Sequence, residues 1–348
     1  MERIEFTQEM KKDHTILVPD MLPIHFALVM NAFELQDYRM EVLKNTGANV
    51  VNAGLQYVHN ATCYPALLVI GQYTPALVIE MVCCALYGDM LMLLKNQAEP
   101  YEAEAGATMA VVDKWVAEIT AQFKKNAALP MLRFKRNLCA IAKDFEAIPR
   151  RKEEKVKVGI VGEIYVKYSA MGNNSLEKFL LEQGCEVNVP GLLGFLAYCL
   201  EVRIDDIDLY GGSKKTRWIL NRAMDLIAHY EKLIAKSIRE NSHYQPAGLF
   251  RESKAHLDGL IGYGCKMGEG WLLPAEMVEL IESGVNNIVC VQPFGCLPNH
   301  IVGKGPIHAL RERFPSANIV PIDYDPSATK VNQENRLKLM LSVAKAEL

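Results

Sequence analysis

Cysteine is the residue type in this sequence that most directly suggests chemistry, because a thiolate acts as a nucleophile or as a metal ligand. The chain has nine cysteines, an odd number, so they cannot all pair with one another, and their spacing forms no compact disulfide framework. The first twelve residues are charged and contain no apolar leader, which predicts a reducing, cytoplasmic location where thiols stay free. The nine are Cys63, Cys83, Cys84, Cys139, Cys185, Cys199, Cys265, Cys290 and Cys296.

Two of these cysteines lie in segments that predict loops at the ends of strands or helices. Cys63 precedes a predicted helix N-terminus, where the partial positive charge of the helix favours a thiolate. Cys296 follows a predicted strand in a segment rich in Pro and Gly, which indicates a tight, non-helical loop with an exposed thiol and free N–H groups. Hydrogen bonds from N–H groups to sulfur tune iron–sulfur clusters. A packing role stays open for both, because the C-x5-C spacing of Cys290 and Cys296 is not a standard metal motif.

The remaining cysteines and several polar motifs have simpler interpretations. Four cysteines lie in apolar segments that predict helices, so we expect them to pack in the core: Cys83, Cys84, Cys139 and Cys199. Of two others, Cys185 opens a predicted strand and Cys265 lies in a Gly-rich turn. His300 and His308 flank the Cys296 loop and either satisfy its carbonyls or act in ligation or proton transfer. Residues 268–271 (GEGW) resemble a phosphate cradle but match no nucleotide fingerprint.

The order of the predicted strands and helices that position these residues indicates an α/β fold. We expect two Rossmann-like parallel-sheet units joined by a helical segment. Apolar runs predict strands in both halves, and amphipathic stretches between them predict helices, an alternation that favours parallel pairing. The strands are expected at 15–19, 38–43, 157–162, 186–190, 287–291 and 318–322. The helices are expected at 23–35, 66–72, 81–94, 110–125, 131–145, 174–183, 214–238, 274–282, 307–314 and 332–347, with Asn174 or Ser175 capping the helix at 174–183.

Composition and charge narrow the classes of function. The 348 residues suit roughly two domains, and the charged segment 149–155 predicts a boundary that divides the chain into 1–150 and 151–348. The net charge of −3 offers no general attraction for nucleic acid. No apolar run reaches the roughly 20 residues that a spanning helix needs, so we expect no membrane contact.

Several motifs resemble the proteins related to the 2-hydroxyacyl-CoA dehydratases and their activases, in particular the C-terminal portion of large fused activase-related proteins of anaerobic bacteria. The resemblance spans nearly the whole chain and is most specific in its second half. The motifs that carry it are NATCYP at 60–65, VIGQ at 69–72, VGEI at 161–164, GEGWL at 268–272, QPFGCLPNH at 292–300, DYDP at 323–326 and NQxNR at 332–336.

This resemblance implies a dehydratase-like fold that holds a 4Fe-4S cluster through cysteines, reduced by an ATP-hydrolysing activase partner. By position, Cys63 and Cys296 match family cysteines, as does Cys290 with a less defined role. An acyl-CoA or another small molecule is the implied substrate, and a homodimer is one expected assembly. With two or three cysteine ligands, one iron stays open, and the cluster should be labile.

One departure from the family concerns residues 80 and 81. From residue 81 the sequence resembles a part of the family sequences that normally follows much later in the chain. The segment between, which would hold a further cysteine ligand, is therefore absent. Two functions therefore stand: an iron–sulfur electron-transfer or reductase component, or a cluster-free α/β binding or scaffold module. The first predicts that Cys63 and Cys296 approach each other although they are far apart in sequence.

Overall fold

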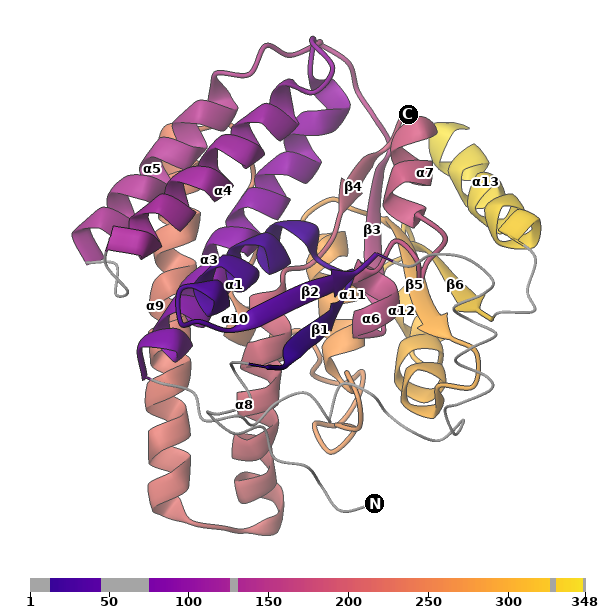
Figure 1. The fold of residues 1–348 in the computed structure, drawn as a ribbon. Helices are drawn as coiled ribbons and strands as arrows, with labels where there is room; N and C mark the ends of the chain where they lie inside the picture. The colour runs from indigo at the N-terminus through magenta and orange to yellow at the C-terminus, as the bar shows by residue number, and fades with distance from the viewer. Residues whose placement is uncertain (1–12, 45–74, 126–130, 326–329, 347–348) are drawn as a thin grey trace.

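The computed structural model describes residues 13–44, 75–125, 131–325 and 330–346, which form two parallel sheets and a larger number of helices (Figure 1). The α/β class predicted from the sequence is confirmed. Segment 58–65, with Cys63, lies outside the described residues.

The first sheet pairs β1 (Thr15–Pro19) in parallel with β2 (Arg39–Leu43), both as predicted. The crossover between them is α1 (Pro23–Glu34), which begins with Pro at a position where the missing N–H costs nothing. Ile24, Leu28 and Ala32 fall on one face of this helix and are buried. That face packs on the helices that follow in the chain.

Three long helices link the first sheet to the second half of the chain, in the region where helices were predicted. They are α3 (Pro75–Ala98), α4 (Ala107–Lys125) and α5 (Met131–Glu146), with a short 3₁₀ turn, η3 (Glu99–Tyr101), after α3. Helix α3 runs without a break across Glu80 and Met81, the point at which the family resemblance placed an absent segment.

The second sheet has four parallel strands in the order β4-β3-β5-β6. Their bounds are β3 (Lys157–Gly162), β4 (Glu186–Asn188), β5 (Asn287–Pro293) and β6 (Asn318–Tyr324). The two central strands are buried along nearly their whole length, as expected for a parallel sheet covered on both faces. The chain leaves β3 toward β4 on one side and later returns to add β5 on the other, so the crossovers change direction between β3 and β5.

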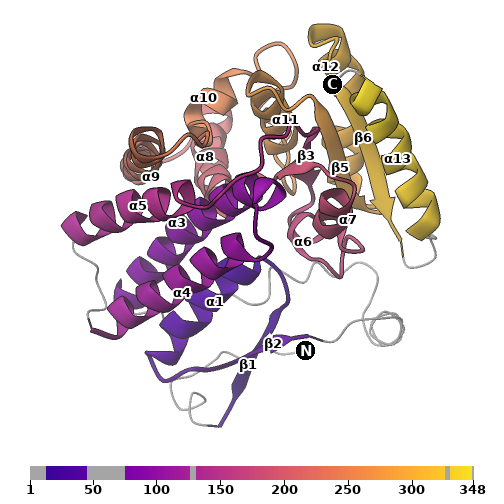
Figure 2. The same cartoon turned by 90° about the horizontal axis from the view of Figure 1, so that it is seen from above.

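Helices cover both faces of this second sheet (Figure 2). Side chains of α7 and α13 pack on one face, and those of α11 and α12 pack on the other. The helices of this half are α6 (Ile164–Tyr168), α7 (Leu176–Glu182), α8 (Leu192–Tyr210), α9 (Lys214–Asn241), α10 (Phe250–Ala255), α11 (Leu272–Glu282), α12 (Ile307–Arg313) and α13 (Lys330–Ala346), with a π-helical turn, η4 (Asn299–Lys304). The sequence did not predict α6, α8, α10 or η4. Ser175 is the N-cap residue of α7, as one of the two predicted alternatives, but its side chain makes no capping hydrogen bond; instead Asn173 Oδ1 accepts from Leu176 N.

A single hydrophobic cluster extends from Leu22 to Ala344 and joins both sides of residue 150. Side chains of α1, α3 and α5 belong to it together with side chains of β3, α7 and α13. The division into 1–150 and 151–348 therefore stays a prediction about units that share one core.

At Gly162, the last residue of β3, the two central strands approach closely. Its φ is +145°, and a Cβ there would lie 1.9 Å from the carbonyl oxygen of Val291. The next residue donates its N–H to that same carbonyl at 2.9 Å. Only glycine fits, and it brings the loop after β3 beside the carboxyl end of β5.

Candidate functional site

The carboxyl ends of β3 and β5 form the switch point of the sheet, the place where open parallel sheets bind ligands. Cys296 lies there, after a turn in which Gly295 adopts φ +78°, and its side chain is partly exposed. The predicted non-helical loop is correct only for this turn. Helical structure begins at Leu297, because Pro298 falls in the first turn of the helix, where proline is tolerated.

Asn299 connects Cys296 to the loop before α11. Its side chain is fully buried, and its Nδ2 donates to Cys296 Sγ at 3.2 Å and to Glu269 Oε2 at 3.2 Å. Its Oδ1 is buried without a hydrogen-bond partner among the described residues. A buried amide oxygen left unpaired is costly, so this atom has unused capacity for a donor at the site.

Two carboxylates occupy the N–H groups at the start of α6. Glu269 Oε1 accepts from Ile164 N at 2.9 Å, and Glu163 accepts from Val166 N at 2.8 Å. Burial raises the pKa of Glu163, and the neighbouring Glu269 adds to that rise. Because carboxylates fill these donors, the GEGW loop supplies an anion to this helix end instead of cradling a phosphate there.

A second polar group lies beside Cys296 at the ends of β5 and β6. Asp323 accepts from Lys304 Nζ at 2.7 Å and from Gln292 Nε2 at 2.8 Å. Burial would raise the pKa of Asp323, but these two hydrogen bonds more than offset it and hold the pKa below its usual value. His300 bridges the two groups, with Nδ1 at 2.8 Å from the carbonyl oxygen of Cys296 and Nε2 at 3.6 Å from Asp323. Since a carbonyl only accepts, Nδ1 is the donor.

Cys290 is placed differently from Cys296. It is fully buried in β5 on the face that packs on α11 and α12, and a Cβ at Gly303 would lie 3.2 Å from its sulfur. Burial raises the pKa of its thiol to about 12, so the sulfur is protonated in this position. Within the described residues, no group of three His, Cys, Asp or Glu side chains is arranged to hold a metal ion. The predicted approach of Cys63 to Cys296 stays a prediction, because Cys63 lies outside the described residues.

The other sequence-predicted positions divide between core and surface. Cys84 and Cys185 are buried, and Cys83 and Cys139 are partly buried. The prediction of core packing is wrong for Cys199, which lies on the exposed side of α8. His308 is also exposed and faces Glu312 one turn later at 3.2 Å, away from the site. The sequence reasoning missed Asn299 and Glu163, although both stand within motifs already noted.

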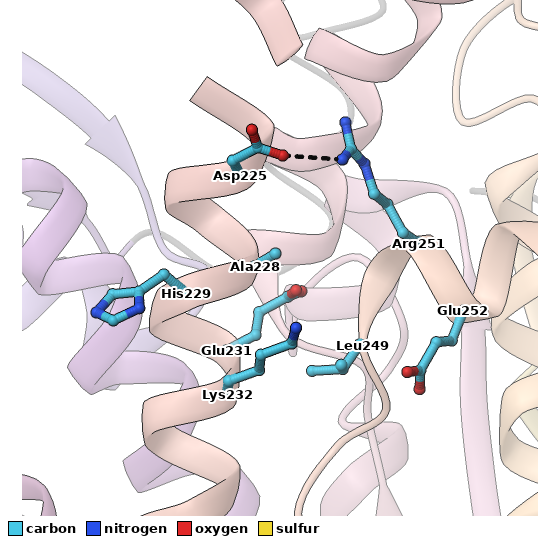
Figure 3. A pocket seen from close by; sticks show the side chains of 8 residues that line it. All are labelled: Asp225, Ala228, His229, Glu231, Lys232, Leu249, Arg251 and Glu252. Atoms are coloured by element: carbon cyan, nitrogen blue, oxygen red, sulfur yellow. Dashed lines mark hydrogen bonds and ion pairs between the residues drawn. The ribbon is translucent and has the colours of Figure 1, made fainter. Parts of the chain in front are cut away.

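A separate hollow of about 410 Å³ lies between α9 and the start of α10 (Figure 3). Asp225 and Arg251 form an ion pair at its edge, at 3.1 Å. Glu231 lines it and accepts from Phe250 N at 3.3 Å, while burial, with Glu279 and Glu252 nearby, raises the pKa of Glu231 to about 7. Its lining is formed almost entirely by α9 and the segment around α10, so it is distinct from the sheet edge.

Comparisons with known proteins add no relative: no family model matches the chain, and neither a curated protein nor a solved structure is similar to it. No helix among the described residues is long and apolar enough to cross a membrane.

Proposed function

We propose that this chain is an iron–sulfur electron-transfer or reductase component, in which Cys296 is a ligand of a 4Fe-4S cluster at the carboxyl edge of the four-stranded sheet. The observation that supports this most is the environment of Cys296, a partly exposed thiol at the switch point that accepts a hydrogen bond from buried Asn299. A charge-neutral hydrogen-bond donor to a ligating sulfur favours reduction of a cluster. When bound, the cluster would supply one-electron chemistry.

The remaining ligands of the proposed cluster are Cys63 and Cys290, both by family resemblance. Cys290 is the weaker candidate, because ligation would require a thiol that is fully buried among the side chains of α11 and α12 to lose its proton. An ATP-hydrolysing activase as the electron donor and an acyl-CoA or other small molecule as the substrate complete the proposal. The dehydratase-like arrangement of two sheet units belongs to it as well.

A cluster-free α/β binding module is the second candidate, and the state of Cys290 favours it. A thiol that is protonated and packed among apolar side chains acts as a small hydrophobic residue. In this function, Glu269 and Asn299, the latter through its unpaired Oδ1, would bind a small molecule directly beside Cys296.

Anaerobic reconstitution with iron and sulfide distinguishes the two candidates. We expect Cys296→Ser to lower bound iron and sulfide to less than half of the wild-type content and to change the electron paramagnetic resonance spectrum of the reduced protein. Cys139→Ser is the matched control, because Cys139 lies on α5 in the helical layer and its sulfur contacts only the Ser237 hydroxyl at 3.8 Å among described polar groups. Equal iron in the wild type and both variants would remove Cys296 as a ligand and leave the binding module.

A further inference from the structure

The turn that joins α8 to α9 protrudes at one end of the molecule (Figure 1). Every residue from 208 to 219 is exposed, including four large apolar side chains with 51–72% of their surface accessible. We call these four the hairpin patch: Leu209, Tyr210, Trp218 and Ile219. Single exposed apolar residues are ordinary, but a group of four at one point marks an interaction surface.

A bidentate ion pair holds the two helix ends together at this point. Arg217 Nε donates to Asp208 Oδ1 at 2.6 Å, and Arg217 Nη2 donates to Asp208 Oδ2 at 2.9 Å. The hairpin patch is thus gathered on the last turn of α8 and the first two turns of α9. It is a convex end, so its partner must be flat or deformable.

The charges around the hairpin patch are unbalanced toward positive. The acidic side chains near it are each in an ion pair with a cation: Asp205 with Lys254, Asp206 with Lys266, Asp208 with Arg217, and Asp225 with Arg222 and Arg251. Among the described residues, no ion pair involves Arg203, Lys214 or Lys215, three cations that lie within two turns of the tip. The chain as a whole carries −3, so this positive charge is local.

We propose that the hairpin patch docks on an anionic lipid surface. Trp and Tyr prefer the membrane–water interface because one end of each ring is apolar and the other is polar. Lysines at the same depth are attracted by anionic headgroups. Surface docking requires no spanning helix, so it is compatible with the absence of one among the described residues, but it departs from the composition-based expectation of no membrane contact.

Tryptophan fluorescence tests this proposal directly, because Trp218 is the exposed member of the three tryptophans. Trp115 and Trp271 are 6% and 0% accessible. Adding vesicles of phosphatidylcholine with phosphatidylglycerol to the full chain should shift the emission to shorter wavelength and protect it from iodide quenching. Vesicles of phosphatidylcholine alone should produce little change. Raising the salt concentration should weaken the binding, because exposed charges are screened.

Lys214→Gln with Lys215→Gln should lower vesicle binding in co-sedimentation about 30-fold, as expected for two interfacial lysines. Both positions are in the first turn of α9, where removing positive charge favours the helix dipole, so a loss of binding will not reflect unfolding. Lys124→Gln with Lys125→Gln is the matched control, because these exposed neighbours at the end of α4 change the net charge equally.

Trp218→Ala with Ile219→Ala should also abolish binding. The proposal is overturned if the emission of the wild type ignores anionic vesicles, or if the control pair reduces binding as much as the α9 pair. It is also overturned if Trp218 emission shifts with protein concentration in the absence of lipid, since a second copy or another protein would then cover the hairpin patch.

Discussion

Burial separates two cysteines that lie close together in sequence around the end of β5. Cys290 points into the layer of α11 and α12, whereas Cys296 lies past the last strand residue and contacts the polar groups of the edge. A chemical role for a cysteine depends on access and on its thiolate fraction. Of the two, Cys296 has the access and Cys290 does not.

Glu231 gives a pH-dependent stability that can be measured. Its pKa in the folded chain is raised by burial from 4.5 to about 7, so the folded state binds the proton more tightly than the unfolded state. The contribution of Glu231 to the free energy of unfolding is fully present below about pH 4.5 and is lost as the pH rises through about 7. Glu231→Gln should abolish that loss and stabilise the chain above pH 7 by at most on the order of 3 kcal/mol.

Urea unfolding near pH 5 and near pH 8 measures this difference. Glu252→Gln is the control, because Glu252 lines the same hollow and is exposed. If both variants change the pH dependence equally, the effect comes from net charge and the assignment to buried Glu231 is wrong.

At the scale of elements, Asp89 connects three helices. This carboxylate of α3 accepts from His25 of α1 at 2.7 Å and from the N–H groups of Leu192 and Leu193, at 2.7 and 2.8 Å. It thereby satisfies orphan donors at the start of α8, whose own N-cap is Gly191. The close contact with Gly191 leaves no space for a side chain there, since a Cβ would lie 2.6 Å from the Asp89 carboxyl carbon.

Two helical glycines give opposite predictions for this junction. A Cβ at Gly88 would lie 2.3 Å from the buried His25 ring, so Gly88→Ala should displace that ring and lower the free energy of unfolding by about 1–3 kcal/mol. Gly194 in α8 has no atom within 4 Å of its Cβ position, so Gly194→Ala should raise stability by up to about 1 kcal/mol. Urea midpoints of the two variants, compared with the wild type, provide the measurement. Destabilisation of similar size in both would contradict the packing of His25 on α3.

Strands that depend on a short run of apolar residues could be predicted from the sequence, whereas elements fixed by contacts between distant segments could not. The four strands of the second sheet are short apolar runs next to turn residues, and their positions were predicted to within two residues at each end. Helix α8 was missed because the β-branched residues Val202, Ile204 and Ile207 lower the helix propensity of the segment. In addition, the carboxylate that accepts from its first N–H groups, Asp89, lies 103 positions away in the sequence. The contact between Asn299 and Glu269, and that between Glu269 and Ile164, likewise join distant loops that no spacing rule relates.

At the scale of the whole molecule, the shared core predicts one cooperative unfolding transition. One hydrophobic cluster joins both sides of residue 150, and a buried hydrogen bond from Tyr101 to Glu186, at 2.8 Å, crosses the same boundary. Trp115 and Trp271 are buried on opposite sides of it. In the unaltered chain, tryptophan fluorescence and far-ultraviolet circular dichroism should therefore report the same urea midpoint. Two separate midpoints would show that residues 1–150 and 151–348 unfold independently.

The order of strands also has a consequence for how the chain is made. Val158 of β3 pairs with Asn287 of β5, so 129 residues (287 − 158) separate the partners of the central ladder. At a synthesis rate of about 5–20 residues per second, the ribosome needs roughly 6–26 s to produce β5 after β3. Throughout that interval, one edge of an apolar strand is unpaired. A nascent chain with this topology depends on chaperones or on transient contacts of its own helices to protect that edge, and slower translation between residues 162 and 287 should increase aggregation during synthesis.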